Sequence, residues 1–394
     1  MRILFVPPND WMTHPTPMRH HFLFKRIAKS YRCEVYVLNL DGLGRSRTIH
    51  NPDLVLDENI QLVGKHSLSA ANPALYYVLN SKHTCNVIRH AIKELQIDIV
   101  VNSNLLPGAI AAKMAQRAEI PIVYDCMEYY PESASSYFKC PVARSLVESS
   151  VRQLMHYVIR KSDLVITVSD SHASLVKTVD PSKRVYVVPN GVDLEMFRPS
   201  DGDRLIDRAC TSSLDLVYVG SVDVWLDMVS VLKAIEILKR EGLRVQLTIV
   251  GGSHGGFYIE QMKSFGRSLG LENNLTFVGF VPYRSVPDYI NAADVALAPY
   301  RNVLKNDVTP LKVLEYLACQ KIVLCTPVPE IMKRFGNIVY SYDGPKDLAR
   351  LLRQILQHRI DFENRARNAR QMLSDYSWDV LADKYHQILN WVVN

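Results

Sequence analysis

The sequence predicts an α/β protein of two doubly wound domains in tandem, each a parallel sheet with helices on both faces. Short β-branched runs alternate with longer helical segments from end to end, which is typical of βα units. The series breaks once, at a polar stretch between Phe197 and Leu214, and then restarts. With 394 residues, 48% of them hydrophobic and 22% charged, the chain is long enough for two domains and has an ordinary globular composition.

The first domain is expected to span residues 1–200. Six strands are predicted in it, at Arg2–Val6, Cys33–Leu38, Ile97–Val101, Ile120–Tyr124, Leu164–Val168 and Arg184–Val188. Helical patterns lie between them, for example at Arg19–Lys29, Ala74–Leu95 and Val142–Lys161.

The second domain is expected to span residues 201–375. Its predicted strands are Leu214–Val219, Val245–Val250, Leu275–Val278, Val295–Leu297 and Ile322–Leu324. After Gly344 the strand pattern ends and the chain reads as helical. Residues 376–394 form a last helix with an aromatic and aliphatic stripe, which could cross back to the first domain.

The net charge of +6 is too small to indicate a nucleic-acid partner, but it is unevenly distributed. Residues 1–200 hold 23 Lys and Arg against 18 Asp and Glu, and basic residues such as Lys25, Arg26 and Lys29 are dense between Arg19 and Arg47. This basic segment indicates either a seat for an acidic substrate or anionic membrane surface, or simply a solvated helix face.

Cysteine usage and hydropathy suggest a cytoplasmic protein. The seven cysteines include no CxxC pair, so neither a disulfide framework nor a zinc knuckle is expected. The N-terminal strand leads into Pro7 without the apolar stretch of a secretory signal, and no apolar run is long enough to span a membrane. Any membrane contact is therefore expected to be peripheral, on the cytoplasmic face.

The segment from Thr309 to Glu315 is the most informative part of the chain. Thr309 can cap a helix and Pro310 suits the first helical position, so the amides of Leu311 and Lys312 would form an anion site. Glu315 lies one turn deeper and could accept hydrogen bonds from a hydroxyl pair. The same spacing also fits a capped helix with a surface ion pair. The position after the Val295–Leu297 strand favours a ligand, because open α/β sheets bind ligands at that edge.

A second loop of this kind follows the strand that starts the second domain. Gly220 lets the backbone approach a ligand closely and Ser221 adds a hydroxyl. The glycine-rich stretch 250–256 lacks the spacing of a dinucleotide-binding fingerprint, and the chain has no phosphate-binding NTPase motif. NAD binding is therefore not expected.

Five blocks together resemble glycosyltransferase family 4, whose members are retaining enzymes of the GT-B fold. They are VITVSD at Val165–Asp170, VPNGVD at Val188–Asp193, YVGS at Tyr218–Ser221, FVGFVP at Phe277–Pro282 and TPLKVLEYLACQKIV at Thr309–Val323. The resemblance implies two Rossmann-like domains facing a central cleft. It also implies that the C-terminal domain holds a nucleotide diphosphate-sugar and the N-terminal domain holds the acceptor.

The resemblance also assigns donor-binding residues. Glu315 corresponds to the second acid of the family's E-x7-E motif, which contacts ribose, and Asp307 stands in place of the first acid, near the donor sugar. Pro310, Leu311 and Lys312 correspond to the diphosphate site. Further positions implied at the donor are Gly220, Ser221, Phe280, Val281, Arg301 and Thr309, with Phe280 and Val281 at the base. Ser221 stands where many relatives have Arg, so Lys312 or Arg301 is expected to balance the diphosphate charge.

In the first domain, YDCMEYY resembles the family's YDxHE element. Asp125 and Glu128 match it and are candidate catalytic residues, while Met127 replaces His. Arg19, His20 and His21 begin a helix after the first strand and could contact an anionic acceptor. The alternative for Asp125 and Glu128 is a structural role as caps of their loop.

The resemblance implies a hexosyltransferase-type enzyme that uses no metal and no cofactor besides its nucleotide-sugar co-substrate. The expected acceptor is a glycan or a lipid-linked sugar in cell-surface polysaccharide or glycoconjugate assembly. Two alternatives remain at this point: a GT-B epimerase of UDP-sugars, and a catalytically silent glycan-binding or partner protein.

Overall fold

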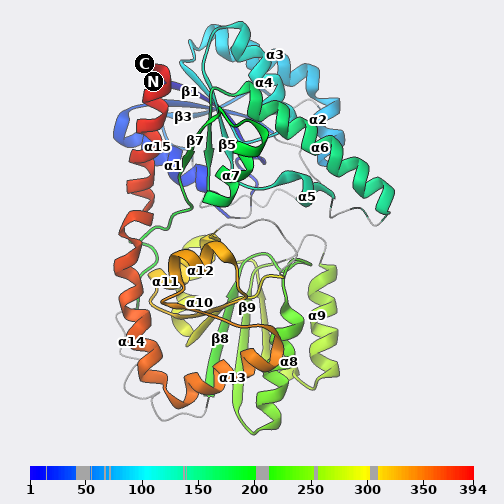
Figure 1. Ribbon diagram of the computed structural model, residues 1–394, viewed down its shortest axis with the longest axis vertical. Helices are drawn as coiled ribbons and strands as arrows, with labels where there is room; N and C mark the ends of the chain where they lie inside the picture. Colours follow the sequence, from blue (N-terminus) through cyan, green and yellow to red (C-terminus); the bar gives the residue numbers. More distant parts are fainter. Residues whose placement is uncertain are drawn as a thin grey trace. The chain divides into compact units, whose positions relative to one another are not determined.

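The computed structural model consists of two compact units, each described here by itself (Figure 1). Unit 1 comprises Met1–Pro189 and Trp378–Asn394, and unit 2 comprises Asn190–Ser377. The structure describes residues 1–14, 16–40, 54, 56–65, 68–70, 72–135, 138, 140–200, 213–252, 256–301 and 309–394. Within these ranges, no helix combines the length and the apolar character that crossing a membrane requires.

Unit 1 contains a seven-stranded parallel sheet in the order β3-β2-β1-β4-β5-β6-β7. Its strands are β1 Arg2–Val6, β2 Glu34–Leu38, β3 Ile60–Val63, β4 Ile99–Asn102, β5 Ile122–Cys126, β6 Leu164–Thr167 and β7 Arg184–Val187. Six of them match the expected strands to within a few residues. The seventh, β3, is a partly exposed edge strand that was not predicted, since four residues with one buried side chain give little periodic signal.

Helices flank this sheet. They are α1 Arg19–Tyr31, α2 Pro73–Leu79, α3 Ser81–Glu94, α4 Leu106–Arg117, α5 Tyr130–Ser135, α6 Pro141–Lys161, α7 Asp170–Val179 and α15 Trp378–Val393. The single helix expected at Ala74–Leu95 is in fact two, because the chain turns at Asn80. The buried Asn80 amide donates to the Leu68 carbonyl (2.9 Å) and accepts from the Leu68 amide (3.2 Å), which ties the break to the preceding segment.

The last helix, α15, packs on α1 within unit 1 (Figure 1). Phe22 stacks on the buried Trp378, with ring centroids 5.1 Å apart and planes nearly parallel. At the rim of the contact, Arg26 pairs with Asp379 at 2.8 Å. Because apolar burial stabilises by roughly 25 cal/mol per Å², the two large rings are expected to dominate this contact over the exposed ion pair.

Unit 2 contains a six-stranded parallel sheet in the order β10-β9-β8-β11-β12-β13. Its strands are β8 Ser213–Val219, β9 Arg244–Val250, β10 Leu275–Gly279, β11 Val295–Ala298, β12 Ile322–Cys325 and β13 Val339–Ser341. Its α-helices are α8 Met228–Arg240, α9 Phe257–Ser268, α10 Val286–Ala292, α11 Leu311–Ala318, α12 Pro329–Phe335, α13 Gly344–Gln357 and α14 Arg359–Ala369, and its 3-10 turns are Glu272–Asn274, Tyr283–Ser285 and Arg370–Tyr376. Of the strands, only the three-residue edge strand β13 was not predicted.

The boundary between the units lies at Pro189, whereas the sequence pattern placed it at residue 200. The Arg370 guanidinium explains the difference, because it donates to the carbonyls of Leu194 and Phe197 and holds them on unit 2. The amide of Val192 also bonds to the Tyr376 carbonyl at 2.9 Å. The turn-forming residues after Phe197 therefore follow the boundary and do not mark it.

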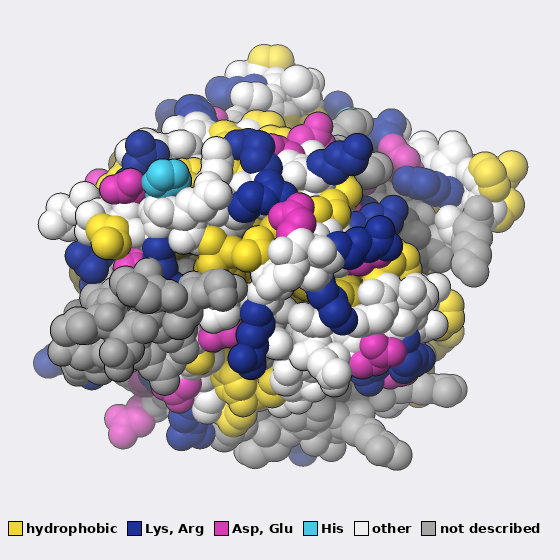
Figure 2. Space-filling view, turned by 90° about the horizontal axis from the view of Figure 1, so that it is seen from below, with side chains coloured by type: hydrophobic (Ala, Val, Ile, Leu, Met, Phe, Trp, Pro, Cys, Tyr) yellow, Lys and Arg dark blue, Asp and Glu magenta, His cyan; other side chains and the backbone are white. Residues whose placement is uncertain are grey.

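The surface is of mixed character. Figure 2 shows one face of the molecule, on which Lys and Arg side chains lie among Asp and Glu side chains and hydrophobic patches. Interspersed charges of this kind are those of an ordinary globular surface and indicate no single-sign field on that face.

Candidate functional site

In unit 2 the loops after β8 and β9 approach each other so closely that only glycine fits. Gly220 and Gly251 have φ values of +128° and +125°, which L side chains rarely adopt. A Cβ on Gly251 would lie 2.1 Å from the Gly220 carbonyl oxygen. The Gly220 amide donates to the Val250 carbonyl at 2.9 Å, and the Gly251 amide to the Gly279 carbonyl at 2.8 Å. Backbone from three strand ends thus lies close together at the carboxyl edge of the sheet.

Lys312 lies directly against this glycine loop. A Cβ on Gly220 would be 2.7 Å from the Lys312 Nζ. The ammonium donates to the Tyr218 hydroxyl at 2.8 Å, and that hydroxyl donates to the Ser221 carbonyl at 2.6 Å. Tyr218 therefore fixes both the loop and the charge beside it. Gly220, Ser221 and Lys312 were predicted at the donor from the sequence, whereas Tyr218 was not.

Glu315 occupies the next turn of α11 and is 5% exposed. It accepts a hydrogen bond from the Tyr283 hydroxyl at 2.6 Å. Burial raises the pKa of Glu315 to about 7, although Tyr283 and Lys312 oppose that shift. Burial lowers the pKa of Lys312 to about 7, opposed by the charge of Glu315. Both groups thus titrate near neutral pH, so a bound anion would favour the charged form of Lys312.

The start of α11 corrects the predicted cap. The helix begins at Leu311, and Pro310 occupies the N-cap in an extended conformation (φ −67°, ψ 146°). Its carbonyl accepts from the Val313 amide at 3.1 Å. Thr309 is therefore one residue too early to cap, and its buried hydroxyl has no partner within the described part of the chain. In a helix that begins at Leu311, the amides of Leu311 and Lys312 belong to the first turn and have no acceptor inside the helix.

Phe280 and Val281 follow β10 at the same edge of the sheet. The Phe280 ring covers Gly252 so closely that a Cβ there would lie 2.2 Å from a ring atom. Phe280 nevertheless stays 54% exposed, and Val281 is half-buried. An aromatic ring that is held on backbone and open to solvent can stack on a planar ligand group.

Arg301 connects two loops at this edge. Its backbone amide donates to the Trp225 carbonyl at 2.9 Å, and its Nε donates to the Leu226 carbonyl at 3.1 Å. Part of its donor capacity is therefore used on the chain itself. Among the described residues, the charged group found next to Gly220 is Lys312. Asp307 lies outside the described residues.

In unit 1, three predicted site residues form a buried network. Asp125 is fully buried at the end of β5, and its Oδ2 accepts from His20 Nε2 (3.0 Å) and the Tyr385 hydroxyl (2.9 Å), with Arg19 Nε at 3.4 Å. Burial raises the pKa of Asp125, but Arg19 and His20 outweigh it and hold that pKa below its ordinary value. Arg19 also donates to the carbonyls of Val188 (3.0 Å) and Pro189 (3.1 Å).

This network corrects two predictions. Asp125 was expected to act on substrate, and Arg19 and His20 were expected to contact an acceptor, but all three are at most 2% exposed and bind one another. They hold α1, β5, α15 and the segment at Val188 and Pro189 together. The structural alternative therefore applies to Asp125.

His21 also has structural partners. Its Nδ1 accepts from the Met18 amide at 3.0 Å, so the proton is on Nε2, which donates to the Trp11 carbonyl at 2.9 Å. Burial lowers the pKa of His21 to about 3, so it is neutral at physiological pH. Because both ring nitrogens are bonded to backbone, His21 offers an acceptor no donor, contrary to the prediction.

Glu128, in the loop after β5, is the predicted catalytic acid that stays accessible. Its side chain is partly exposed, and desolvation raises its pKa to about 7. A carboxyl group with that pKa can exchange a proton near neutral pH. The catalytic role expected of Glu128 therefore stays a prediction.

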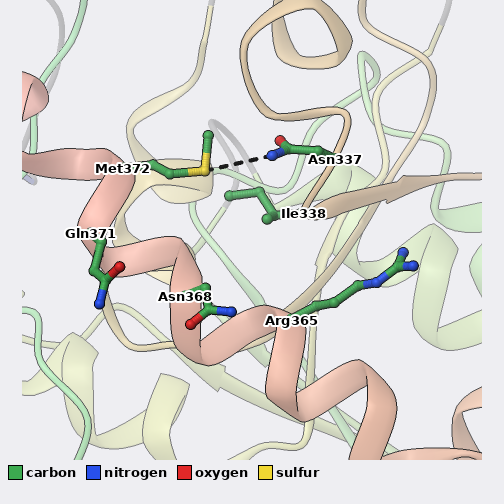
Figure 3. A pocket seen from close by; sticks show the side chains of 6 residues that line it. All are labelled: Asn337, Ile338, Arg365, Asn368, Gln371 and Met372. Carbon is green, nitrogen blue, oxygen red and sulfur yellow. Dashed lines mark hydrogen bonds between the residues drawn. The ribbon is translucent and has the colours of Figure 1, made fainter.

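One further hollow lies elsewhere in unit 2. A hollow of about 670 Å³ lies near the start of β13, and Figure 3 shows the side chains that line it. Its lining consists of Asn337, Ile338, Arg365, Asn368, Gln371 and Met372. None of these residues was predicted to be functional.

Within the described ranges, no three His, Cys, Asp or Glu side chains cluster closely enough to hold a metal ion.

Comparisons with protein families match both halves of the chain. Residues 27–196 match the family model described as Glycosyltransferase Family 4, and residues 213–358 match the one described as Glycosyl transferases group 1. A Bacillus subtilis (strain 168) protein provisionally described as a teichuronic acid biosynthesis glycosyltransferase, TuaH, is 25% identical over 281 residues. That match covers 68% of this chain and 66% of TuaH, slightly under two thirds of its length.

Solved structures resemble the whole chain. Sucrose-phosphate synthase from Thermosynechococcus elongatus superposes with a TM-score of 0.79 at 14% identity, covering 99% of this chain and 98% of that one. Anabaena HepE in complex with UDP-glucose superposes with a TM-score of 0.69 at 16% identity, covering 99% and 100%. At these identities the likeness concerns the fold, and it agrees with the two sheets described above.

Proposed function

This chain belongs to the GT-B glycosyltransferases, and we propose that it transfers a hexosyl group from a nucleoside diphosphate sugar to a glycan or lipid-linked acceptor, with retention at the anomeric carbon. The observation that carries the proposal is the contact of Lys312 with the Gly220 loop, with Glu315 one helical turn deeper. An ammonium, first-turn backbone amides and a buried carboxylate on one short helix are the groups that a nucleoside diphosphate needs.

The proposed roles follow from this arrangement. The diphosphate lies against the first-turn amides and Lys312, because the helix start and the ammonium both stabilise negative charge. Glu315, held by Tyr283, accepts hydrogen bonds from the ribose hydroxyls. The base stacks on the exposed Phe280 ring.

During transfer, the bond between the anomeric carbon and the leaving phosphate oxygen breaks while the acceptor oxygen bonds to the same face of the sugar. Negative charge grows on the leaving diphosphate, so Lys312 and the helix amides contribute most where that charge develops. The acceptor hydroxyl loses its proton, and Glu128, with a pKa of about 7, is the candidate group to take it.

The names of relatives support the choice of substrates. The UDP-glucose bound by HepE favours a UDP-sugar as the donor. The teichuronic acid name of TuaH favours an acidic cell-surface polysaccharide as the destination. We keep the expectation that transfer needs no metal or further cofactor, and the measurement that checks it is turnover with and without a chelator.

The decisive experiment is donor turnover. The purified protein is incubated with a panel of UDP- and GDP-sugars and an acceptor extract, and release of the nucleoside diphosphate is measured. We expect turnover with one donor and a loss of about 10- to 100-fold in kcat/KM in Glu315→Ala, because a hydrogen bond to a charged group contributes about 1.5–3 kcal/mol and the ribose hydroxyls would lose that partner. Glu272→Ala, which removes an exposed carboxylate of the same unit, is the matched control.

Three results would overturn parts of the proposal. Donor binding without turnover would favour the silent glycan-binding protein. An isomerised sugar released without an acceptor would favour the epimerase. Full turnover in Glu315→Ala would refute the assignment of Glu315 to the donor site, although the proposed activity would stand.

A further inference from the structure

The ammonium of Lys312 lies close to two aromatic rings in unit 2. It is 4.3 Å from the centroid of the Tyr218 ring and 5.5 Å from the centroid of the Tyr300 ring. A ring attracts a cation that lies over its face within about 6 Å of its centroid. On the basis of the proposed function, we propose that Tyr218 and Tyr300, the tyrosine pair, are positioning residues that hold the Lys312 ammonium in place for the donor diphosphate.

Tyr218 acts through both its ring and its hydroxyl. The residue is fully buried on β8, and burial holds the pKa of Tyr218 well above its ordinary value. The hydroxyl therefore keeps its proton and donates it to the Ser221 carbonyl at 2.6 Å. The same oxygen accepts from the Lys312 ammonium at 2.8 Å. Tyr218 thus links the ammonium to the residue that follows Gly220.

Tyr300 acts through its ring alone. Its backbone is fixed, because residues 299–301 pair with residues 225–227 through amide-to-carbonyl hydrogen bonds of 2.8 and 2.9 Å. The Tyr300 amide also donates to the Thr326 hydroxyl at 3.0 Å. The buried Tyr300 hydroxyl has no hydrogen-bond partner in the described part of the chain. What Tyr300 offers Lys312 is therefore the face of an anchored ring.

The charge of Lys312 needs this support. The groups that face the ammonium are Tyr218 on β8, Tyr300 after β11 and, one turn along α11, Glu315. Burial lowers the pKa of Lys312 to about 7, and the charge of Glu315 opposes that shift. A hydroxyl that accepts from an ammonium and rings that attract it both favour its protonated form. The tyrosine pair therefore helps to keep Lys312 charged as well as in place.

The ammonium keeps hydrogens for a ligand. A lysine ammonium has three donor hydrogens, and the Tyr218 hydroxyl takes one of them. Within the described ranges, Lys312 makes no other hydrogen bond and no ion pair. Two hydrogens therefore remain for phosphate oxygens, which form charge-assisted bonds with an ammonium.

The main test compares the binding of UDP with that of uridine, which lacks the diphosphate. Tyr218→Phe keeps the ring and removes the hydroxyl, so calorimetry on the full chain should show UDP affinity about tenfold weaker and uridine affinity unchanged. In a Lys312→Ala background the same substitution should cause no further loss, because no ammonium is left to hold. Tyr342→Phe changes another buried tyrosine of unit 2 and should bind UDP like wild type.

Tyr300 provides a second variant, which also serves if Tyr218→Phe fails to fold. Tyr300→Leu removes the ring and should weaken UDP binding by about threefold, the size of a cation–π contact. Tyr300→Phe keeps the ring and should restore the affinity. Equal UDP affinity in Tyr300→Leu and wild type would exclude Tyr300 from the positioning role.

Trace acetylation of lysines at a series of pH values measures the protonation of Lys312 without any nucleotide. Read by mass spectrometry, the midpoint of Lys312 labelling should move to lower pH by about one unit in Tyr218→Phe, because the protonated form loses its acceptor. The midpoint of Lys233, which is exposed on α8, should not move.

The two measurements separate the tyrosine pair from the proposed function. If wild type binds UDP and Tyr218→Phe changes neither the affinity nor the midpoint of Lys312, the positioning role is wrong and the donor site stands. A shifted midpoint in a protein that does not bind UDP would support the tyrosine pair and overturn the donor site. Equal losses of UDP and uridine affinity in Tyr218→Phe would indicate a general defect of unit 2 and refute a role through Lys312.

Discussion

Polar residues lie at the carboxyl edges of both sheets, but their surroundings differ. In unit 2, Lys312 lies beside the partly buried Gly220 loop, and Glu315 lies one helical turn further along α11. In unit 1, Asp125 also follows a strand end, but Arg19, His20 and Tyr385 enclose it. A polar residue at a strand end is thus available for binding only if no later element covers it. In unit 1 that element is α15, from the other end of the chain.

The comparison predicts that Asp125 serves stability. Asp125→Ala should lower the free energy of unfolding by about 3–5 kcal/mol, because it leaves Arg19 buried without its carboxylate. Urea denaturation measures the change. Asp379→Ala breaks the exposed ion pair with Arg26 in the same α1–α15 contact and should cost less than about 1 kcal/mol. Equal effects of the two variants would show that burial does not distinguish them.

Replacing Lys312 should reduce activity and leave stability almost unchanged, which is the opposite of the effect expected for Asp125. Lys312→Ala should reduce donor turnover by about 100-fold or more, since the leaving diphosphate loses its nearest fixed charge. Stability should change little, because the variant removes a charge that burial desolvates. Turnover with the preferred nucleotide-sugar measures the effect, with Lys233→Ala on the exposed face of α8 as the control. Unchanged turnover would transfer the neutralising role to Arg301 or another group.

Tyr385 gives a second test of whether the Asp125 network serves stability and not donor binding. Tyr385→Phe removes one hydrogen bond to the buried Asp125 carboxylate and should cost about 1.5–3 kcal/mol of stability, with no change in affinity for UDP. Tyr31→Phe is the matched control, because its hydroxyl bonds to Asp383 on an exposed surface. Urea denaturation and UDP titration check both variants. Weaker UDP binding in folded Tyr385→Phe would connect α15 to the donor site and contradict the division of roles.

Much of the fold could be predicted because strands and helices repeat their patterns locally. The predicted strands were found, and the two missed strands, β3 and β13, are short edge strands with few buried residues. The helix break at Asn80 depends on a hydrogen bond to Leu68, which local periodicity does not record.

The site could be predicted only in part, for the same reason. Gly220, Lys312 and Glu315 belong to recognisable blocks, and unit 2 brings them together. Tyr385 lies 260 residues from Asp125 in sequence, so no local pattern connects them. Tyr218 and Tyr283 belong to a set of 20 tyrosines, and sequence spacing does not single them out.

The pH dependence of UDP binding tests the roles of Lys312 and Glu315 in the proposed donor site. As pH rises above 7, Lys312, whose pKa burial lowers to about 7, loses its proton, so affinity should fall by up to about tenfold per pH unit. As pH falls below 7, Glu315, whose pKa burial raises to about 7, becomes protonated and accepts hydrogen bonds less well. Affinity measured by calorimetry should therefore peak near pH 7.

Two variants show which residue causes the loss of affinity on each side of the pH optimum. Lys312→Arg keeps a charge that does not titrate in this range, so the alkaline decline should flatten. Glu315→Gln cannot ionise, so the decline on the acid side should shrink to what the titration of the UDP phosphate itself causes. If both variants keep the wild-type profile, the titrating groups lie outside the Lys312 and Glu315 pair. Lys312 and Glu315 would then not make the carboxyl edge of unit 2 responsive to ligand charge. In this respect that edge would not differ from the carboxyl edge of unit 1, where Asp125 is enclosed.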